Sequence, residues 1–302
     1  MESDDSIIMN IAESNKWKAE VLFQILFALA SSKELKDVLV YKGALILNKR
    51  LGTERMSLDI DSNLLQAFVL AYPEKKEQEV FLETTLNKAI SKYFNRQEPV
   101  RYEVSSIKIQ RSPIIDHPLG WDAFSIKINV TDYLNRGVRG LPALSIDVAA
   151  PETLTENSVS DIELGGHVVS AYTLERIAGE KMRAFLSTLP AYRAKVKKPG
   201  EAVRVKDLYD LAQILKVKPI DDEYFWGLAG NEFKLACSSR FIDCEGVVTF
   251  KENWKETQKA YADEPMLPKD IQFDEIEKGI ASIIQFLSRN NITPFDYPLP
   301  EK

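Results

Sequence analysis

Three aspartates occur in runs that alternate between apolar and polar residues. Asp59 and Asp61 lie two apart in Arg55 to Asp61 (RMSLDID), and Asp147 lies in Leu144 to Ala149 (LSIDVA). Side chains two apart on a strand project from the same face, so each run predicts acids on a polar face. Hard carboxylate oxygens suit Mg²⁺ or Mn²⁺, so Asp59, Asp61 and Asp147 are candidates for a divalent-metal site. Spacing alone favours the alternative, a solvated strand face, because such acid pairs are common there.

Other reactive residue types are scarce. The chain has 302 residues and contains two histidines and two cysteines, namely His117, His167, Cys237 and Cys244. Histidine-rich metal sites and four-cysteine zinc sites are therefore disfavoured, and so few cysteines are typical of a reducing compartment. Chemistry in this chain is expected to depend on carboxylates, lysines and a bound metal.

A candidate phosphate-binding turn precedes the first two acids. The apolar residues Val38, Leu39 and Val40 lead into Lys42, Gly43 and Ala44, and Ala44 to Leu51 has helical spacing. This order predicts a strand, a glycine turn and a helix. Backbone N–H groups at such a helix start can bind phosphate.

The remaining patterns predict an α+β fold. A helix is expected at Trp17 to Ser31, capped by Ser14 or Asn15, and another at Glu74 to Phe94. Strands are expected at Asp37 to Tyr41, Arg55 to Asp61, Arg101 to Gln110 with a bulge near Ser105 and Ser106, Phe124 to Val130, and Leu144 to Ala149. Beyond about residue 165 only helices are expected, at Tyr172 to Leu189, Val205 to Leu215, Glu223 to Ala236, Asn253 to Tyr261 and Phe273 to Arg289.

The change of pattern near Gly165 and Gly166 predicts two domains. We expect residues 1–165 to form an α+β domain and residues 166–302 a helical C-terminal domain that completes the active-site cleft. No run is long and apolar enough to cross a bilayer, and Glu2, Asp4 and Asp5 give the N-terminus the wrong charge for a signal peptide. A cytoplasmic protein is expected.

Taken together, these motifs resemble the AbiEii/AbiGii-type nucleotidyltransferase toxin family. The resemblance includes the Lys42-Gly43-Ala44 turn and the RxSxDxD pattern of Arg55, Ser57, Asp59 and Asp61. It also includes the helix Tyr172 to Leu186 with its EKMRA core, and Lys206 to Leu211 (KDLYDL), which is similar to the family's RDLYDL element. The motifs agree in order over about residues 38–215. Ala44 replaces a second glycine or serine, and Lys206 replaces an arginine.

This resemblance implies a nucleotidyltransferase-like mixed sheet and transfer of a nucleoside monophosphate from an NTP to an acceptor. It implies Mg²⁺ on Asp59 and Asp61, with Asp147 as third ligand or as base. The residues implied to bind nucleotide are Lys42, Gly43, Ala44, Arg55, Ser57 and Lys181. It further implies the toxin of a toxin–antitoxin or phage-defence system, with a cognate antitoxin as partner and RNA, such as the 3′ end of tRNA, as acceptor.

Lys181 also stands out on helical geometry. On a helix of 3.6 residues per turn it falls inside the apolar arc formed by Ile177, Met182 and their neighbours. It either snorkels at the edge of the core or, as the resemblance implies, binds the triphosphate. Asp207 is a candidate base or orienting residue. Asp210, Arg183 and Lys206 are further candidates, and the acids have solvent exposure or ion pairing as the alternative.

The charge balance bears on the acceptor. The formal net charge is −6, so a nucleic acid would have to meet a local basic patch. The stretch Pro190 to Glu201, with Arg193, Lys195, Lys197 and Lys198, is expected to be an exposed basic loop that either binds RNA phosphates or serves solubility. The alternatives kept open are a protein side chain as acceptor, kinase-like transfer of the γ-phosphoryl group to a protein, and a non-catalytic nucleotide-binding regulator.

Overall fold

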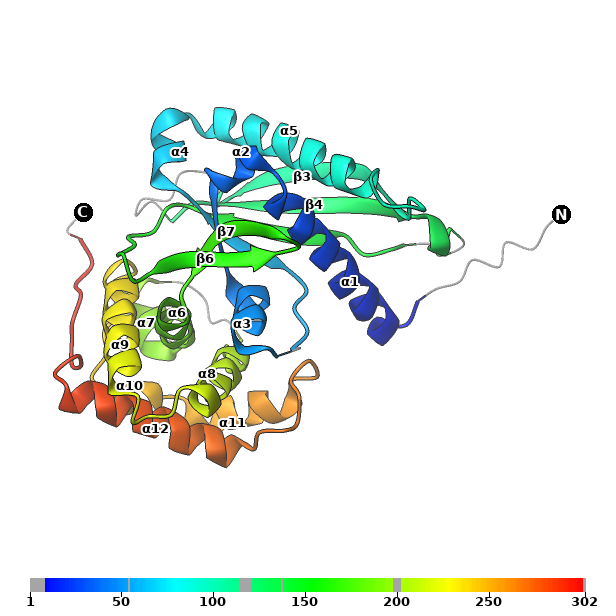
Figure 1. Ribbon diagram of the computed structural model, residues 1–302. Coiled ribbons are helices and arrows are strands. Elements are labelled where there is room, and N and C mark those ends of the chain that lie inside the picture. The colour runs from blue at the N-terminus through cyan, green and yellow to red at the C-terminus, as the bar shows by residue number, and fades with distance from the viewer. Residues whose placement is uncertain are drawn as a thin grey trace. The chain divides into compact units, whose positions relative to one another are not determined.

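The fold combines α-helices with a seven-stranded mixed sheet (Figure 1). The structure is a computed structural model, and it describes residues 9–53, 55–114, 121–136, 138, 140–197 and 202–300. The acidic N-terminus with Glu2, Asp4 and Asp5, as well as His117 and Lys198, lies outside the described residues. The expected α+β class with a mixed sheet and a mostly helical C-terminal part is confirmed.

Internal contacts divide the chain into two compact units. Unit 1 contains residues 1–46, 56–152 and 161–171, and unit 2 contains residues 47–55, 153–160 and 172–302. Each unit is therefore built from three stretches of sequence. The expected domain limits, 1–165 and 166–302, stay a prediction.

The sheet belongs to unit 1 apart from the ends of two strands. Its order is β3-β4-β5-β2-β1-β7-β6. The strands are β1 (Leu39–Lys42), β2 (Ile60–Leu64), β3 (Tyr102–Ser112), β4 (Ala123–Asp132), β5 (Leu144–Ala149), β6 (Val159–Leu164) and β7 (His167–Tyr172). Strand β2 pairs antiparallel with β1 and parallel with β5. The two central strands that carry the predicted acids are thus direct neighbours.

Unit 1 also contains helices, three of which contact strands of this sheet. They are α1 (Ile11–Ala30), α2 (Lys33–Lys36), α4 (Gln66–Ala71), α5 (Lys75–Phe94) and the first turn of α3 (Gly43–Leu51), with the 3-10 turn Tyr133–Asn135 after β4. Helix α5 runs along β3 and β4 and covers one face of them (Figure 1). That face presents the buried side chains Phe124, Ile126 and Ile128 of β4. The alternating residues of β4 and β5 lie on the opposite, polar face.

Most expected elements of unit 1 are confirmed, with corrections at their ends. Helix α1 begins six residues earlier than expected, because Asn10, rather than Ser14 or Asn15, caps it through a capping box with Glu13. The bulge expected in β3 is confirmed as a register shift between Val104 and Ser106.

The strand expected at residues 55–61 is displaced. Strand β2 begins only at Ile60, and Met56 is 37% exposed instead of lying on an inward face. Residues 55–59 form the approach to the strand, where Ser57 binds the Asp59 carboxylate instead of a ladder partner. Asp59 therefore lies just before the strand and Asp61 within it.

The expectation that strands end near residue 165 was wrong. Gly165 and Gly166, with φ of +57° and +80°, form the turn of the hairpin between β6 and β7. Strand β6 is the sheet edge and is mostly exposed, so it lacks the apolar alternation that reveals half-buried strands.

Unit 2 is mostly helical. Its helices are the remainder of α3, α6 (Leu174–Leu186), α7 (Pro190–Lys195), α8 (Val205–Val217), α9 (Glu223–Ser238), α10 (Val247–Phe250), α11 (Trp254–Asp263) and α12 (Phe273–Arg289). The five helices expected from the sequence correspond to α6, α8, α9, α11 and α12. The first part of the basic segment expected as a loop forms α7, with Pro190 at its first turn, and Arg193 is buried to 8% exposure.

Candidate metal centre and nucleotide site

The three predicted acids meet on the polar face of the sheet in unit 1. Asp59, Asp61 and Asp147 each offer a carboxylate oxygen, and these three atoms lie within 4.8 Å of one another. Asp61 and Asp147 are direct partners in the parallel pairing of β2 with β5. Asp59 joins them because it lies two residues before Asp61, in the bend that leads into β2. Strand register therefore assembles a cluster from positions that are 88 residues apart in sequence.

The glycine turn is packed against one of these acids. Gly43 begins α3 with φ of +77°, and a Cβ placed on it would lie 2.1 Å from the Asp61 Oδ2 atom. Lys42, the preceding residue, is the cross-strand partner of Asp61. Any larger residue at position 43 would be strained in its backbone and would collide with the carboxylate. The glycine is thus required by both conformation and space.

A hydroxyl group orients a second acid. The Ser57 Oγ donates a 2.9 Å hydrogen bond to Asp59 Oδ1. Ser57 is buried, so its bond to the carboxylate is shielded from competing water. The sequence prediction gave Ser57 to the nucleotide, but in the structure its hydroxyl positions Asp59.

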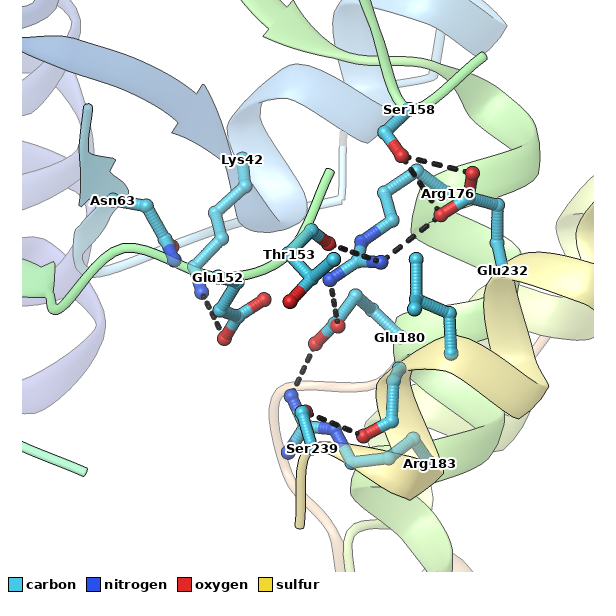
Figure 2. Close-up of polar contacts among 12 residues, drawn as sticks. Lys42, Asn63, Glu152, Thr153, Ser158, Arg176, Glu180, Arg183, Glu232 and Ser239 are labelled. Carbon is cyan, nitrogen blue, oxygen red and sulfur yellow. Dashed lines mark hydrogen bonds and ion pairs between the residues drawn. The ribbon is translucent and has the colours of Figure 1, made fainter. Parts of the chain in front are cut away.

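Lys42 also has a partner that sequence reasoning missed. Its Nζ lies 3.7 Å from the Glu152 carboxylate. Figure 2 marks this ion pair with a dashed line. The chain reaches Glu152 directly after β5, where the Ala150 carbonyl accepts a 2.9 Å hydrogen bond from the Asn63 side chain. No motif marks Glu152 in the sequence, because its role depends on where the chain leaves the sheet.

Two further lysines lie near the acids. The pKa of Lys18 is lowered by partial burial and by the charge of Lys127, while the charge of Asp59 acts in the opposite direction. Lys127 lies on β4 and donates a 2.6 Å hydrogen bond to Ser145 of the neighbouring strand β5. Neither lysine was singled out by sequence reasoning.

The donor set of the cluster fits a hard divalent cation. Three carboxylates held within 4.8 Å of one another repel when all are charged, and a dication bound between them removes this cost. Oxygen donors of this type are those of Mg²⁺ and Mn²⁺ sites, and they leave further coordination positions for water and phosphate oxygens. Asp59, Asp61 and Asp147 are therefore the residues that would hold the metal.

A second charged cluster is buried in unit 2. The Lys181 Nζ lies 2.8 Å from Asp207 Oδ1 and 2.7 Å from Asp210 Oδ2. Burial by itself would lower the pKa of Lys181, but the charges of the two aspartates outweigh it and raise this pKa. The pKa of Asp207 falls to about 2, because Lys181 and Arg204 together overcome the opposing effect of burial. Lys181 and Asp207 are therefore both held in their charged forms at neutral pH.

Arginines extend this cluster at both ends. Arg55 binds Asp210 through two hydrogen bonds, Nε to Oδ1 at 2.8 Å and an Nη to Oδ2 at 3.0 Å. The Arg204 Nε donates to Asp207 Oδ2 at 2.5 Å. The ion pairs kept open for the acids in the sequence are thus present, and their main partner is Lys181. Arg55, predicted to bind nucleotide, is held by Asp210 in the structure.

The remaining predicted residues form separate ion pairs. Arg183 pairs with Glu180, and the Lys206 Nζ lies 3.3 Å from the Glu264 carboxylate. Glu180 also pairs with the buried Arg176, which binds Glu232 at 2.9 Å (Figure 2). Arg183 therefore belongs to a network that holds α6 against α9 within unit 2.

Comparison with known proteins places the chain in a family. Residues 24–280 match the family described as "Nucleotidyl transferase AbiEii toxin, Type IV TA system". The chain belongs to the AbiEii family. It is accordingly a nucleotidyltransferase toxin, and the family implies a nucleotide substrate and an antitoxin partner. This confirms the resemblance seen in the motifs.

Two solved structures from Helicobacter pylori share the fold. One, solved as a candidate nucleotidyltransferase, is 15% identical, covers 92% of this chain and 96% of its own, and has a TM-score of 0.51. The other, JHP933, is 13% identical, covers 93% and 94%, and has a TM-score of 0.53. No curated protein matches the chain. Within the described residues, no helix is long and apolar enough to span a membrane.

Proposed function

We propose that this protein transfers a nucleoside monophosphate from an NTP to a hydroxyl group of RNA, such as the 3′ end of tRNA, in a Mg²⁺-dependent reaction. The observation that carries the proposal is the cluster of Asp59, Asp61 and Asp147 beside the Gly43 turn. Acids that bind a metal and a helix start that binds phosphate are the two groups that a metal–triphosphate substrate needs. A metal bound by these acids would offset the charge of the triphosphate.

The reaction is a displacement at the α-phosphorus. The acceptor hydroxyl oxygen forms a bond to this phosphorus, the bond to the oxygen that bridges the α- and β-phosphates breaks, and pyrophosphate leaves with the bond electrons. Asp147 accepts the hydroxyl proton in this proposal, because its side chain is the exposed member of the cluster. Ser57 keeps Asp59 oriented for metal binding.

The triphosphate is assigned to the helix start and to basic groups. The backbone N–H groups of Gly43 and Ala44 donate to phosphate oxygens, and the glycine leaves room for a close approach. Lys42 contributes positive charge. Lys181 and Asp207 are proposed to serve the same reaction on the strength of the family motif, Lys181 with the triphosphate and Asp207 as an orienting acid.

The biological role follows from the family. We propose that the protein acts in the cytoplasm as the toxin of a toxin–antitoxin system used in phage defence. Expression should slow growth, and co-expression of the antitoxin should relieve it. An Asp59→Asn variant should express to the same level without slowing growth.

The chemistry is tested by product analysis. Purified wild-type protein is incubated with each NTP in turn, Mg²⁺ and total tRNA, and both RNA length and pyrophosphate release are measured. We expect tRNA to lengthen with one pyrophosphate released per nucleotide added, and no product from Asp59→Asn, Asp61→Asn or metal-free protein. Lys181 is tested with the Lys181→Arg variant, which keeps the positive charge, because removal of the cation would leave the Asp207 and Asp210 carboxylates buried together without it. Unchanged product in the Asp59→Asn and Asp61→Asn variants would overturn the proposal.

A further inference from the structure

Two lysines face each other on the polar side of the sheet. Lys108 on β3 is the direct cross-strand partner of Lys127 on β4, and both side chains are exposed. Like charges directly opposite each other on antiparallel strands repel and destabilise the pairing. Among the described residues, neither lysine forms an ion pair with a carboxylate. This lysine pair is therefore an arrangement that an anion would stabilise.

The lysine pair lies beside the acid cluster. Strand register places Ser145 of β5 opposite Lys127 of β4, which in turn lies opposite Lys108 of β3. Asp147 lies two residues further along β5 on the same face. The Lys127 hydrogen bond to Ser145 fixes this ammonium group close to β5. Neighbouring strands are spaced by roughly 5 Å. Lys127 therefore lies about one strand spacing from the strand that carries Asp147, and Lys108 lies about two spacings from it.

The order of the strands separates the lysine pair from the glycine turn. Across the sheet, β1 leads to Gly43, β2 and β5 carry Asp61 and Asp147, and β4 and β3 carry the lysines. In a displacement at phosphorus, the attacking and leaving oxygens lie roughly in line on opposite sides of the reacting atom. If the pyrophosphate leaves on the side of the glycine turn, the acceptor hydroxyl arrives from the side of β4 and β3.

We propose that Lys108 and Lys127 bind the phosphodiester backbone of the acceptor RNA next to its reacting end. This inference rests on the proposed function for the direction of attack. A single-stranded RNA end carries one negative charge per nucleotide, which matches a row of ammonium groups that leads away from the acids. An acidic protein thereby gains a local surface for RNA.

Direct binding measurements test the surface without requiring catalysis. Fluorescein-labelled tRNA is titrated with full-length wild-type protein and with the Lys108→Gln/Lys127→Gln variant, by anisotropy in EDTA over a series of salt concentrations. We expect the affinity to fall about tenfold near physiological salt, and the slope of log K against log salt to decrease by about one to two. The matched control is Lys33→Gln/Lys36→Gln, since both lysines are exposed on α2, at the end of β1 away from Gly43.

Kinetics separate the acceptor from the nucleotide. In the transfer reaction, the Lys108→Gln/Lys127→Gln variant should raise KM for tRNA about tenfold and leave KM for the NTP unchanged. Equal tRNA binding by this variant and wild type, or a rise in KM for the NTP alone, would overturn the inference even if transfer occurs. Weaker tRNA binding by the variant, in a protein that transfers no nucleotide, would uphold the surface and refute the proposed reaction.

Discussion

Replacement of Gly43 by alanine should disturb the acid cluster and leave the rest of the fold in place. The added Cβ would lie 2.1 Å from Asp61 Oδ2, whereas ordinary van der Waals contact between two such atoms begins at about 3.4 Å. Asp61 must then retreat by more than about 1 Å. Displacement of a reacting or positioning group by this amount can reduce the rate about 100-fold.

The same substitution also strains the backbone. At φ of +77°, an alanine in place of glycine costs about 1–2 kcal/mol of stability. This cost must be distinguished from the effect on Asp61. Gly166 offers the matched control, because its φ is +80° and an added Cβ would meet no atom within 4 Å. Gly166→Ala should therefore lose similar stability and keep its activity.

The assay compares the two variants at one Mg²⁺ concentration. Nucleotide incorporation into tRNA gives kcat/KM, and thermal unfolding gives the change in stability. We expect kcat/KM to fall about 100-fold or more in Gly43→Ala and to stay within twofold of wild type in Gly166→Ala. Full activity of Gly43→Ala, or an equal loss of activity in both variants, would refute the reasoning that Gly43 exists to make room for the Asp61 carboxylate.

Three other substitutions have defined outcomes. Ser57→Ala removes the hydrogen bond to Asp59 and should lower kcat about tenfold, with half-maximal rate at higher Mg²⁺ in a metal titration; an unchanged titration would show that Ser57 does not position Asp59. The pKa of Asp207 is lowered from 3.8 to about 2, so its contribution to stability is complete above about pH 4 and is lost towards pH 2. In urea unfolding, the free energy of unfolding should fall more steeply over this pH range in wild type than in Asp207→Asn, and parallel curves for the two proteins would contradict this. Arg176→Met leaves the buried Glu232 carboxylate without its cation and should lower the free energy of unfolding by about 3–5 kcal/mol, with part of the loss restored in Arg176→Met/Glu232→Leu; a loss below about 1 kcal/mol in the single variant would argue against the network.

Much of the acid cluster could be predicted from sequence because strand periodicity is local. The alternation around Asp61 and around Asp147 gives the polar face without knowledge of strand order, but Asp59, predicted on the same strand as Asp61, lies just before it. What periodicity does not provide is which strands are neighbours. The register of β2 with β5 makes Asp61 and Asp147 direct partners, and only the fold supplies it.

Residues whose partners depend on chain path and strand register were missed, because the sequence does not show which segments are neighbours. Glu152 pairs with Lys42 because of the path of the chain after β5, and Lys108 meets Lys127 because of the register of β3 with β4. The helical position of Lys181 did predict that this lysine lies at the apolar side of its helix, and its role with the nucleotide stays a prediction. Its partners Asp207 and Asp210 lie on another helix, so the sequence left their pairing open.

The most direct test of the central claim follows the two ends of the triphosphate. Wild-type protein and the Asp59→Asn and Asp61→Asn variants are incubated with tRNA, Mg²⁺ and the same NTP labelled at either the α- or the γ-phosphate. Nucleotidyl transfer predicts that the α-label enters tRNA with the wild type alone, while the γ-label appears only in pyrophosphate. Entry of the γ-label into RNA or protein, or equal α-labelling by the aspartate variants, would contradict the account.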